Sequence, residues 1–143
     1  MKISTILDHK QSEVITIDIF STLKTAAELM SQRHIAALVV MENGVAAGLI
    51  SERDIVEAFA IHGRFADEMR VRQVINRQVP AVSPDDTIKR AMSIMTYARI
   101  RHLPVMEEGE LLGIVSLGDV VKYRLEELEL EAGVLRDISV AVR

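Results

Sequence analysis

An internal repeat constrains the fold of this chain more than any other feature of its sequence. Val14–Val56 aligns without gaps with Val79–Val121 at a constant offset of 65, and 15 of these 43 positions are identical. The identical pairs include Thr22/Thr87, Ala26/Ala91, Met30/Met95, Leu38/Leu103, Gly44/Gly109, Gly48/Gly113, Ser51/Ser116 and Asp54/Asp119. Self-similarity at a fixed period indicates that one supersecondary unit occurs twice.

Each copy predicts the element order β-α-β-β-α. A short extended run is followed by apolar residues at helical spacing, and then by two apolar runs that flank a turn. Asn43-Gly44 is a strong two-residue hairpin signal, and Glu108-Gly109 is a weaker one. The expected elements are, in order, an extended run, a helix, two strands and a second helix. In the first copy they lie at Val14–Ile17, Leu23–Arg33, Ala37–Met41, Val45–Ile50 and Ile55–Ile61. In the second copy they lie at Val79–Val82, Ile88–Ala98, Leu103–Met106, Leu111–Val115 and Val120–Glu131. Ser21 or Thr22 suits the N-cap of the first long helix, and Asp85 or Asp86 suits that of its counterpart.

A short lead-in precedes each copy. Ile3-x-x-Ile6-Leu7 matches Val71-x-x-Val74-Ile75 at an offset of 68, and the difference from 65 falls in a loop. The matches predict a first repeat with its lead-in over residues 1–65, a second over residues 66–124, and a helical extension over residues 125–143. In this extension Gly133 is expected to bend or end the helix. The apolar residues of the extension are Leu125, Leu128, Val134, Leu135 and Ile138.

The composition limits how such small units are stabilised. Only 3% of the 143 residues are aromatic, and a unit of about 60 residues buries a small core. We therefore expect an α+β fold in which the two repeats pack through their sheets about a pseudo-two-fold axis, with two related clefts between them.

Composition also argues against several classes of protein. The chain has no cysteine, which excludes disulfides and thiolate metal sites, and its four histidines lack zinc spacing, so no metal site is expected. A net charge of −4 argues against a general nucleic-acid-binding role. No apolar run approaches the ~20 residues of a membrane span, and the N-terminus does not resemble a signal peptide. We expect a cytoplasmic protein with no membrane contact.

The most informative polar residues recur in both copies. Residues 48–54 and 113–119 share the form Gly-φ-φ-Ser-x-x-Asp, where φ is an apolar residue, at a predicted junction of strand and helix. In one interpretation Ser51 and Ser116 cap the helices, and Asp54 and Asp119 complete the caps. In the other, each Asp accepts hydrogen bonds from the hydroxyls of a ribose, while the Ser hydroxyl reaches a ribose or phosphate oxygen.

These motifs resemble the tandem CBS-domain proteins, also called Bateman modules, of the stand-alone prokaryotic type. The resemblance covers about Lys2 to Arg124 and includes the two Gly-φ-φ-Ser-x-x-Asp segments and the turns at Gly44 and Gly109. It also includes His34-Ile35-Ala36-Ala37-Leu38-Val39-Val40 and Arg99-Ile100-Arg101-His102-Leu103-Pro104-Val105.

The resemblance implies two clefts for adenosine ligands. Ser51 with Asp54, and Ser116 with Asp119, would contact the ribose and phosphate. The adenine would lie against the lead-in and second strand of the opposite repeat. For the Asp119 site these are Ser4, Thr5, Ile6 and Leu7 with Ile35, Ala36 and Ala37; for the Asp54 site they are Arg72–Ile75, including Val74 and Ile75, with Ile100, Arg101 and His102.

A phosphate also needs a cation, and the two repeats differ in this respect. Arg99, Arg101 and His102 cluster in the second repeat, where the first has His34, Ala36 and Ala37. Arginine suits phosphate because its planar fork donates two hydrogen bonds at once. Arg101 is the stronger phosphate candidate. For Arg99 a second interpretation is equally open, namely a solvated cation at a helix C-terminus.

Three function classes were compared. The first is a regulatory module that binds an adenine nucleotide and transmits the change to a partner protein. AMP or ATP is the expected ligand, and ADP, NAD(H) and S-adenosylmethionine are further candidates. The second is an enzyme, against which stand the absence of a P-loop, a Gly-rich dinucleotide loop and a base beside either Ser. The third is a dimerisation scaffold without a physiological ligand. We expect the first, as a homodimer without a prosthetic group.

Overall fold

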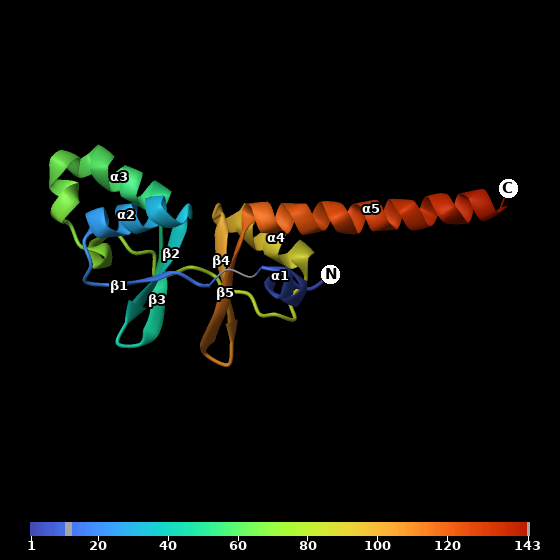
Figure 1. The fold of residues 1–143 in the computed structure, drawn as a ribbon, viewed down its shortest axis with the longest axis horizontal. Coiled ribbons are helices and arrows are strands. Elements are labelled where there is room, and N and C mark those ends of the chain that lie inside the picture. The colour runs from blue at the N-terminus through green and yellow to red at the C-terminus, as the bar shows by residue number, and fades with distance from the viewer. Residues whose placement is uncertain (11–12, 143) are drawn as a thin grey trace. The chain divides into compact units, whose positions relative to one another are not determined.

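The computed structural model describes residues 1–10 and 13–142, with side chains as far as residue 133 (Figure 1). The chain divides into two compact units. We call Glu13–Val79 the first-repeat unit, and Met1–Ser12 with Pro80–Arg143 the second-repeat unit. The elements are, in chain order, α1 (Ile3–His9), β1 (Thr16–Asp18), α2 (Leu23–Arg33), β2 (Ala37–Glu42), β3 (Val45–Ser51), α3 (Glu52–His62), the 3-10 helices η1 (Gly63–Glu68) and η2 (Val71–Gln73), α4 (Ile88–Ala98), β4 (His102–Glu107), β5 (Glu110–Ser116) and α5 (Leu117–Val142).

The first-repeat unit is a three-stranded sheet in the order β1-β2-β3 with helices packed against it. β1 pairs with β2 in parallel, and β2 and β3 form an antiparallel hairpin. Its core joins side chains of α2, the sheet and α3, among them Leu23, Leu38 and Ile50, which are fully buried. The expected β-α-β-β-α order is confirmed in this unit.

The second-repeat unit has the same plan with a shorter sheet. β4 and β5 pair as an antiparallel hairpin, whereas Val82 makes only an isolated parallel bridge to Val105. The strand expected at Val79–Val82 is therefore wrong in extent. Pro80 and Pro84 stand where the first copy has Ile15 and Ile19, and proline cannot donate to a β-ladder.

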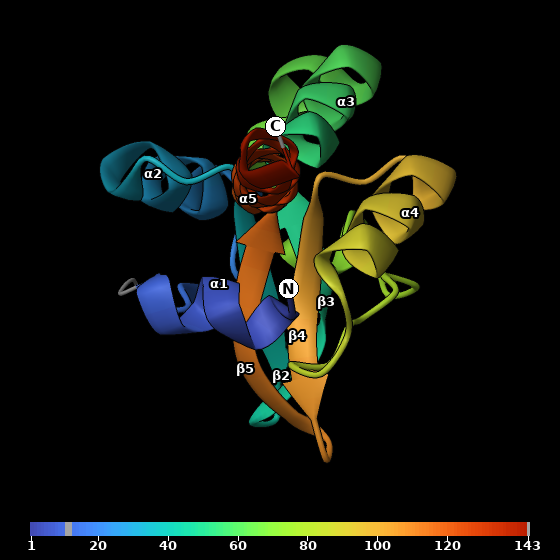
Figure 2. The same ribbon diagram turned by 90° about the vertical axis from the view of Figure 1, so that its right-hand side faces the viewer.

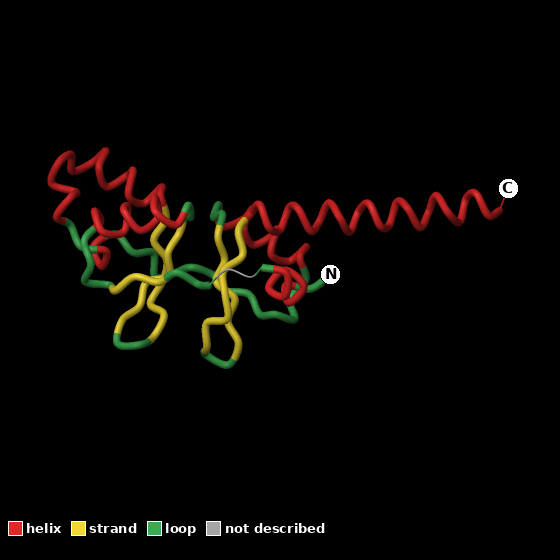
Figure 3. The backbone as a smooth tube through the Cα atoms, in the orientation of Figure 1, coloured by secondary structure: helices red, strands yellow, loops and turns green. Residues whose placement is uncertain are grey.

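Both hairpins have the same turn, which Figure 3 shows as green loops between yellow strands. The φ angles are 52° and 79° at Asn43 and Gly44, and 49° and 80° at Glu108 and Gly109. Two positive φ values define the turn that matches the twist of a two-residue hairpin. Glu108 therefore adopts a left-handed conformation that asparagine tolerates better.

Helices α2 and α4 are each capped by a threonine. The hydroxyls of Thr22 and Thr87 accept from the backbone N–H of Thr25 and Arg90, and cap α2 and α4. The expected cap at Thr22 is confirmed, whereas the caps expected at Asp85 or Asp86 are wrong. Asp86 instead accepts from the Ser83 N–H at 2.7 Å, in the turn before α4.

α5 joins the last helix of the second repeat and the predicted helical extension into one helix. It runs from Leu117 to Val142 without interruption at Gly133, so the break expected there is wrong. A glycine inside a helix costs about 1 kcal/mol relative to alanine, which does not by itself end a helix of this length. The side chains of Val134, Leu135 and Ile138 lie outside the described residues.

Each lead-in packs in the unit of the other repeat. Ile3 and Ile6 of α1 are buried in the core of the second-repeat unit, where α1 contacts β5 and α5 (Figure 2). The Ile3 N–H donates to Asp86 O at 2.9 Å, and the Ile88 N–H donates to Met1 O at 3.1 Å. Val71 of η2 is likewise buried in the core of the first-repeat unit. The sequence repeats and the compact units therefore divide the chain at different points.

Candidate functional site

The first Ser–Asp pair lies where β3 ends and α3 begins. Ser51 is the N-cap of α3, and its hydroxyl accepts from the Asp54 N–H at 3.3 Å. Asp54 Oδ2 accepts in return from the Ser51 N–H at 2.8 Å and from the Ser51 hydroxyl at 3.0 Å. This is a complete capping box, so the structural interpretation of these two residues is confirmed. Both side chains are half-buried, so the pair is also partly accessible.

The second pair repeats this geometry where β5 meets α5. Asp119 Oδ2 accepts from the Ser116 N–H at 2.9 Å, and the Ser116 hydroxyl accepts from the Asp119 N–H at 3.1 Å. The two units therefore share both capping-box hydrogen bonds, and the bond from the Ser51 hydroxyl to Asp54 Oδ2 is additional to them.

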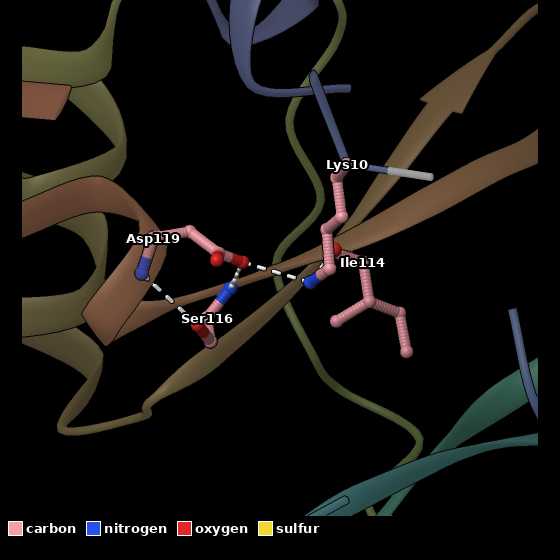
Figure 4. A network of polar contacts seen from close by, with 4 residues as sticks. All are labelled: Lys10, Ile114, Ser116 and Asp119. Carbon is pink, nitrogen blue, oxygen red and sulfur yellow. Dashed lines mark hydrogen bonds and ion pairs between the residues drawn. The ribbon is translucent and has the colours of Figure 1, made fainter. Parts of the chain in front are cut away.

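Lys10 distinguishes the second pair from the first (Figure 4). Its ammonium donates to Asp119 Oδ2 at 2.8 Å and to Ile114 O at 3.0 Å. Burial of the Asp119 carboxylate disfavours its charged form, but the hydrogen bonds and charge of Lys10, together with the Ser116 donors, outweigh this effect. The pKa of Asp119 is lowered as a result. No cation contacts Asp54 in the part of the chain that the structure describes.

The segment before each hairpin contacts the helix start of its own unit. The Glu52 N–H donates to Ala36 O at 3.0 Å, and the Leu117 N–H donates to Arg101 O at 2.8 Å. The predicted contact residues Ile35–Ala37 therefore lie beside Ser51 and Asp54, and Ile100–His102 lie beside Ser116 and Asp119. Their contribution to the opposite site stays a prediction.

The lead-ins also reach the strands that carry the pairs. In the first-repeat unit, Leu49 and Asn76 exchange two backbone hydrogen bonds of 3.1 Å. In the second-repeat unit, Ile114 is the counterpart of Leu49, and its carbonyl accepts from the Lys10 side chain instead. The residues that follow the lead-ins, Asn76 and Lys10, therefore contact the strands that end at Ser51 and Ser116.

The other predicted contact residues differ in accessibility. On α1, Ser4 and Thr5 are half-buried, whereas Ile6 is only 1% exposed and belongs to the core. Val74 and Ile75 are half-buried after η2. A ligand beside α1 would therefore meet Ser4 and Thr5 more readily than the Ile6 side chain.

The predicted cations occupy the end of α4 and the residues after it. Arg99 is the C-cap of α4 in the left-handed conformation, with φ of 55°. The side chains of Arg99 and Arg101 are exposed, and neither forms an ion pair with another described residue. His102 is half-buried at the start of β4.

Sequence reasoning missed Lys10. Its position directly after the lead-in was a usable signal, because the lead-in was expected near Asp119. Only the fold brings residues 10 and 119 together, since they are separated by most of the chain.

Among the described residues there is neither a metal-binding cluster nor a membrane-spanning helix. Over residues 1–10 and 13–142, no group of three or more His, Cys, Asp or Glu side chains could hold a metal ion. Within the same residues, no helix is both long and apolar enough to cross a membrane.

The repeated unit, with a Ser–Asp pair at each junction of strand and helix, defines the class of the protein as a tandem CBS pair. The CBS domain profile matches residues 6–61 and again residues 71–126. The chain therefore belongs to the CBS domain family, and the resemblance seen in the sequence is confirmed.

Several relatives support this assignment. The CBS domain-containing protein YhcV of Bacillus subtilis is 30% identical over 136 residues, which cover 95% of this chain and 96% of that protein. The mitochondrial CBS domain-containing protein CBSX3 of Arabidopsis thaliana is 35% identical over 111 residues. The match covers 74% of this chain and only 54% of CBSX3. A crystal structure of a CBS-domain-containing protein of Agrobacterium tumefaciens is 36% identical with a TM-score of 0.84, covering 87% of this chain and 99% of the other.

Membership in this family narrows the function class. A CBS pair is generally a regulatory, ligand-binding module rather than an enzyme. CBS domains commonly bind adenosine nucleotides.

Proposed function

We propose that this chain is a regulatory module that binds an adenine nucleotide at each Ser–Asp pair and transmits binding to a partner protein. The observation that carries the proposal is the duplication of the pair, with the same bonding in both units. Many residue types can cap a helix, whereas a carboxylate beside a Ser hydroxyl is also suited to bind a ribose and its phosphate.

The charges around the pairs support an anionic ligand. The chain carries a net charge of −4, so a phosphate has to be held by local cations. Arg101 is exposed beside the helix start that carries Ser116, and Arg99 is exposed at the C-cap of α4, two residues before Arg101 in the chain. A guanidinium without an internal ion pair is available to an incoming phosphate. AMP and ATP are the preferred candidates, followed by ADP, NAD(H) and S-adenosylmethionine.

The first experiment is calorimetric titration of the nucleotide-free protein with AMP, ADP, ATP, NADH and S-adenosylmethionine. We expect micromolar binding, equivalent to about −8 kcal/mol, by at least one of them. Asp54→Asn and Asp119→Asn should each weaken one site. Asparagine keeps an oxygen for the cap but loses the charge. This loss should cost roughly 1 kcal/mol for each of two hydrogen bonds to the ribose, which raises the Kd about thirtyfold.

Matched controls separate ribose binding from surface charge. Asp67→Asn in η1 and Asp85→Asn before α4 remove exposed carboxylates from the same two units. Both should bind like the wild type. Equal binding by Asp54→Asn, Asp119→Asn and the controls would show that the ribose assignment is wrong.

A second candidate function is a dimerisation scaffold, favoured by the surface of α5. Leu117, Val121, Leu125 and Leu128 are between 36% and 55% exposed along this helix. Apolar side chains at this spacing follow one stripe of a helix and suit a second copy or a partner. If no nucleotide binds, and if Leu125→Glu with Leu128→Glu converts an oligomer to a monomer in sedimentation, the scaffold function is supported. The cytoplasmic location stays a prediction.

A further inference from the structure

The two Ser–Asp pairs are equal in their capping bonds but unequal in charge. Asp119 Oδ2 accepts from the Lys10 ammonium at 2.8 Å, in addition to its bond from the Ser116 N–H. Asp54 Oδ2 accepts only from the N–H and hydroxyl of Ser51 within the described residues. One carboxylate therefore has an internal counter-ion, and the other has none among the described residues.

The structure also shows why Lys10 is held there. In the first-repeat unit, the Leu49 carbonyl is satisfied by the backbone N–H of Asn76 at 3.1 Å. The corresponding carbonyl of Ile114 accepts from the Lys10 side chain at 3.0 Å. Lys10 thus replaces a backbone donor and bridges the strand and the carboxylate. Its side chain is 34% exposed and that of Asp119 is 27% exposed, so the pair is partly shielded from water.

We propose that Lys10 determines the selectivity between the two sites, because a ribose diol at Asp119 has to compete with its ammonium. This inference rests on the proposed nucleotide-binding function. Oδ2 of Asp119 already has two donors, about as many as one carboxylate oxygen accepts, so a diol that binds both oxygens of this carboxylate has to displace one of them. At Asp54, one of the two donors is a neutral hydroxyl that rotates away without separating charges. Ribose-containing ligands should therefore prefer the Asp54 site.

The test isolates the Asp119 site in an Asp54→Asn background. Adenosine, which has the diol without a phosphate, and AMP are titrated into this protein and into its Lys10→Gln derivative. Lys10→Gln should bind both ligands about fivefold more tightly, the factor that corresponds to an ion pair of roughly 1 kcal/mol. Glutamine can still donate to the Ile114 carbonyl, and thermal unfolding checks that the derivative is folded.

Two further variants separate charge from general effects of the lead-in. Lys2→Gln removes a lysine from the same segment, where its pair with Asp85 is exposed and 3.6 Å long. Lys10→Arg keeps the counter-ion. In the Asp54→Asn background, Lys2→Gln should bind adenosine and AMP with the affinity of the parent protein, and Lys10→Arg should lack the gain in affinity that Lys10→Gln shows.

The outcomes distinguish this inference from the function on which it rests. Unchanged affinity in Lys10→Gln would overturn the inference, and so would weaker AMP binding, which would mean that Lys10 contacts the bound phosphate. If neither the wild type nor any variant binds adenosine or any nucleotide, the proposed function itself fails, and the inference fails with it.

Discussion

Gly48→Ala is expected to detach the second lead-in from the strand that ends at Ser51. A Cβ atom at Gly48 would lie 2.2 Å from the carbonyl oxygen of Asn76 and 3.1 Å from Cδ1 of Ile75. The oxygen belongs to the backbone and accepts a hydrogen bond from the Leu49 N–H, while the Asn76 N–H donates to the Leu49 carbonyl. The oxygen therefore cannot move away without weakening this pair of backbone bonds. Gly48 therefore permits the close approach of two backbones.

The matched substitution is Gly113→Ala at the equivalent position of β5. There the new Cβ would lie 2.8 Å from Cδ2 of Leu7, the far end of a flexible side chain. A leucine can adopt another rotamer at small energetic cost, whereas a hydrogen-bonded backbone cannot. The two substitutions are chemically identical and differ only in what the methyl group meets.

The expected magnitudes follow from these contacts. Overpacking typically costs about 1–3 kcal/mol, and weakening one backbone hydrogen bond adds about 1 kcal/mol. Gly48→Ala should therefore lower the free energy of unfolding by about 2–4 kcal/mol. For a chain of this size, that corresponds to a fall in Tm of roughly 5–15 °C. Gly113→Ala should stay within about 1 kcal/mol of the wild type, because alanine also reduces the entropy of the unfolded chain.

Urea unfolding and hydrogen exchange provide the assay. Urea midpoints give the two free energies, and exchange at the Leu49 and Asn76 amides reports whether the lead-in is still docked. In Gly48→Ala both amides should lose protection before the rest of the first-repeat unit. Equal destabilisation by the two substitutions, or unchanged protection of these amides, would refute the reasoning.

Two further predictions concern helix capping and pH. Thr87→Ala removes the N-cap of α4 and should lower the free energy of unfolding, measured in urea, by about 1 kcal/mol. Asp85→Ala is the control, because Asp85 is exposed and was a candidate cap in the sequence, and it should have almost no effect. The pKa of Asp119 is lowered in the folded chain, so its contribution to stability is present above the unfolded pKa, near 3.9, and is lost as pH falls through the folded pKa. The stability difference between wild type and Lys10→Gln should therefore be largest at neutral pH and should shrink towards pH 3; a constant difference would exclude the ion pair as its source.

The elements were largely predictable because their signals are local. The helices at Leu23–Arg33 and Ile88–Ala98 have the predicted bounds, since apolar spacing and capping residues act within a few turns. The turns at Asn43-Gly44 and Glu108-Gly109 were also identified correctly, because glycine at a positive φ angle is a property of the residue itself. The N-cap predicted at Asp85 or Asp86 was wrong, because the neighbouring Thr87 caps α4 instead.

The Ser–Asp pairs were predictable as residues but not in their surroundings. Repetition alone identified Ser51, Asp54, Ser116 and Asp119, and their capping geometry follows from a spacing of three residues. The ammonium at Asp119 was missed. The lead-in was expected near Asp119, but only the fold shows that Lys10, the residue after α1 (Ile3–His9), reaches this carboxylate far along the chain.

By itself, then, the sequence determined the repeated α+β unit, the family, and the carboxylate at each helix start. These depend on patterns that the chain repeats within short segments. The tertiary structure alone decided that each lead-in packs in the unit of the other repeat, that Gly48 meets a backbone where Gly113 meets a side chain, and that Lys10 neutralises one of two otherwise equivalent aspartates. Those differences arise from contacts between distant segments, and a pair of equal motifs becomes unequal only when the chain folds around them.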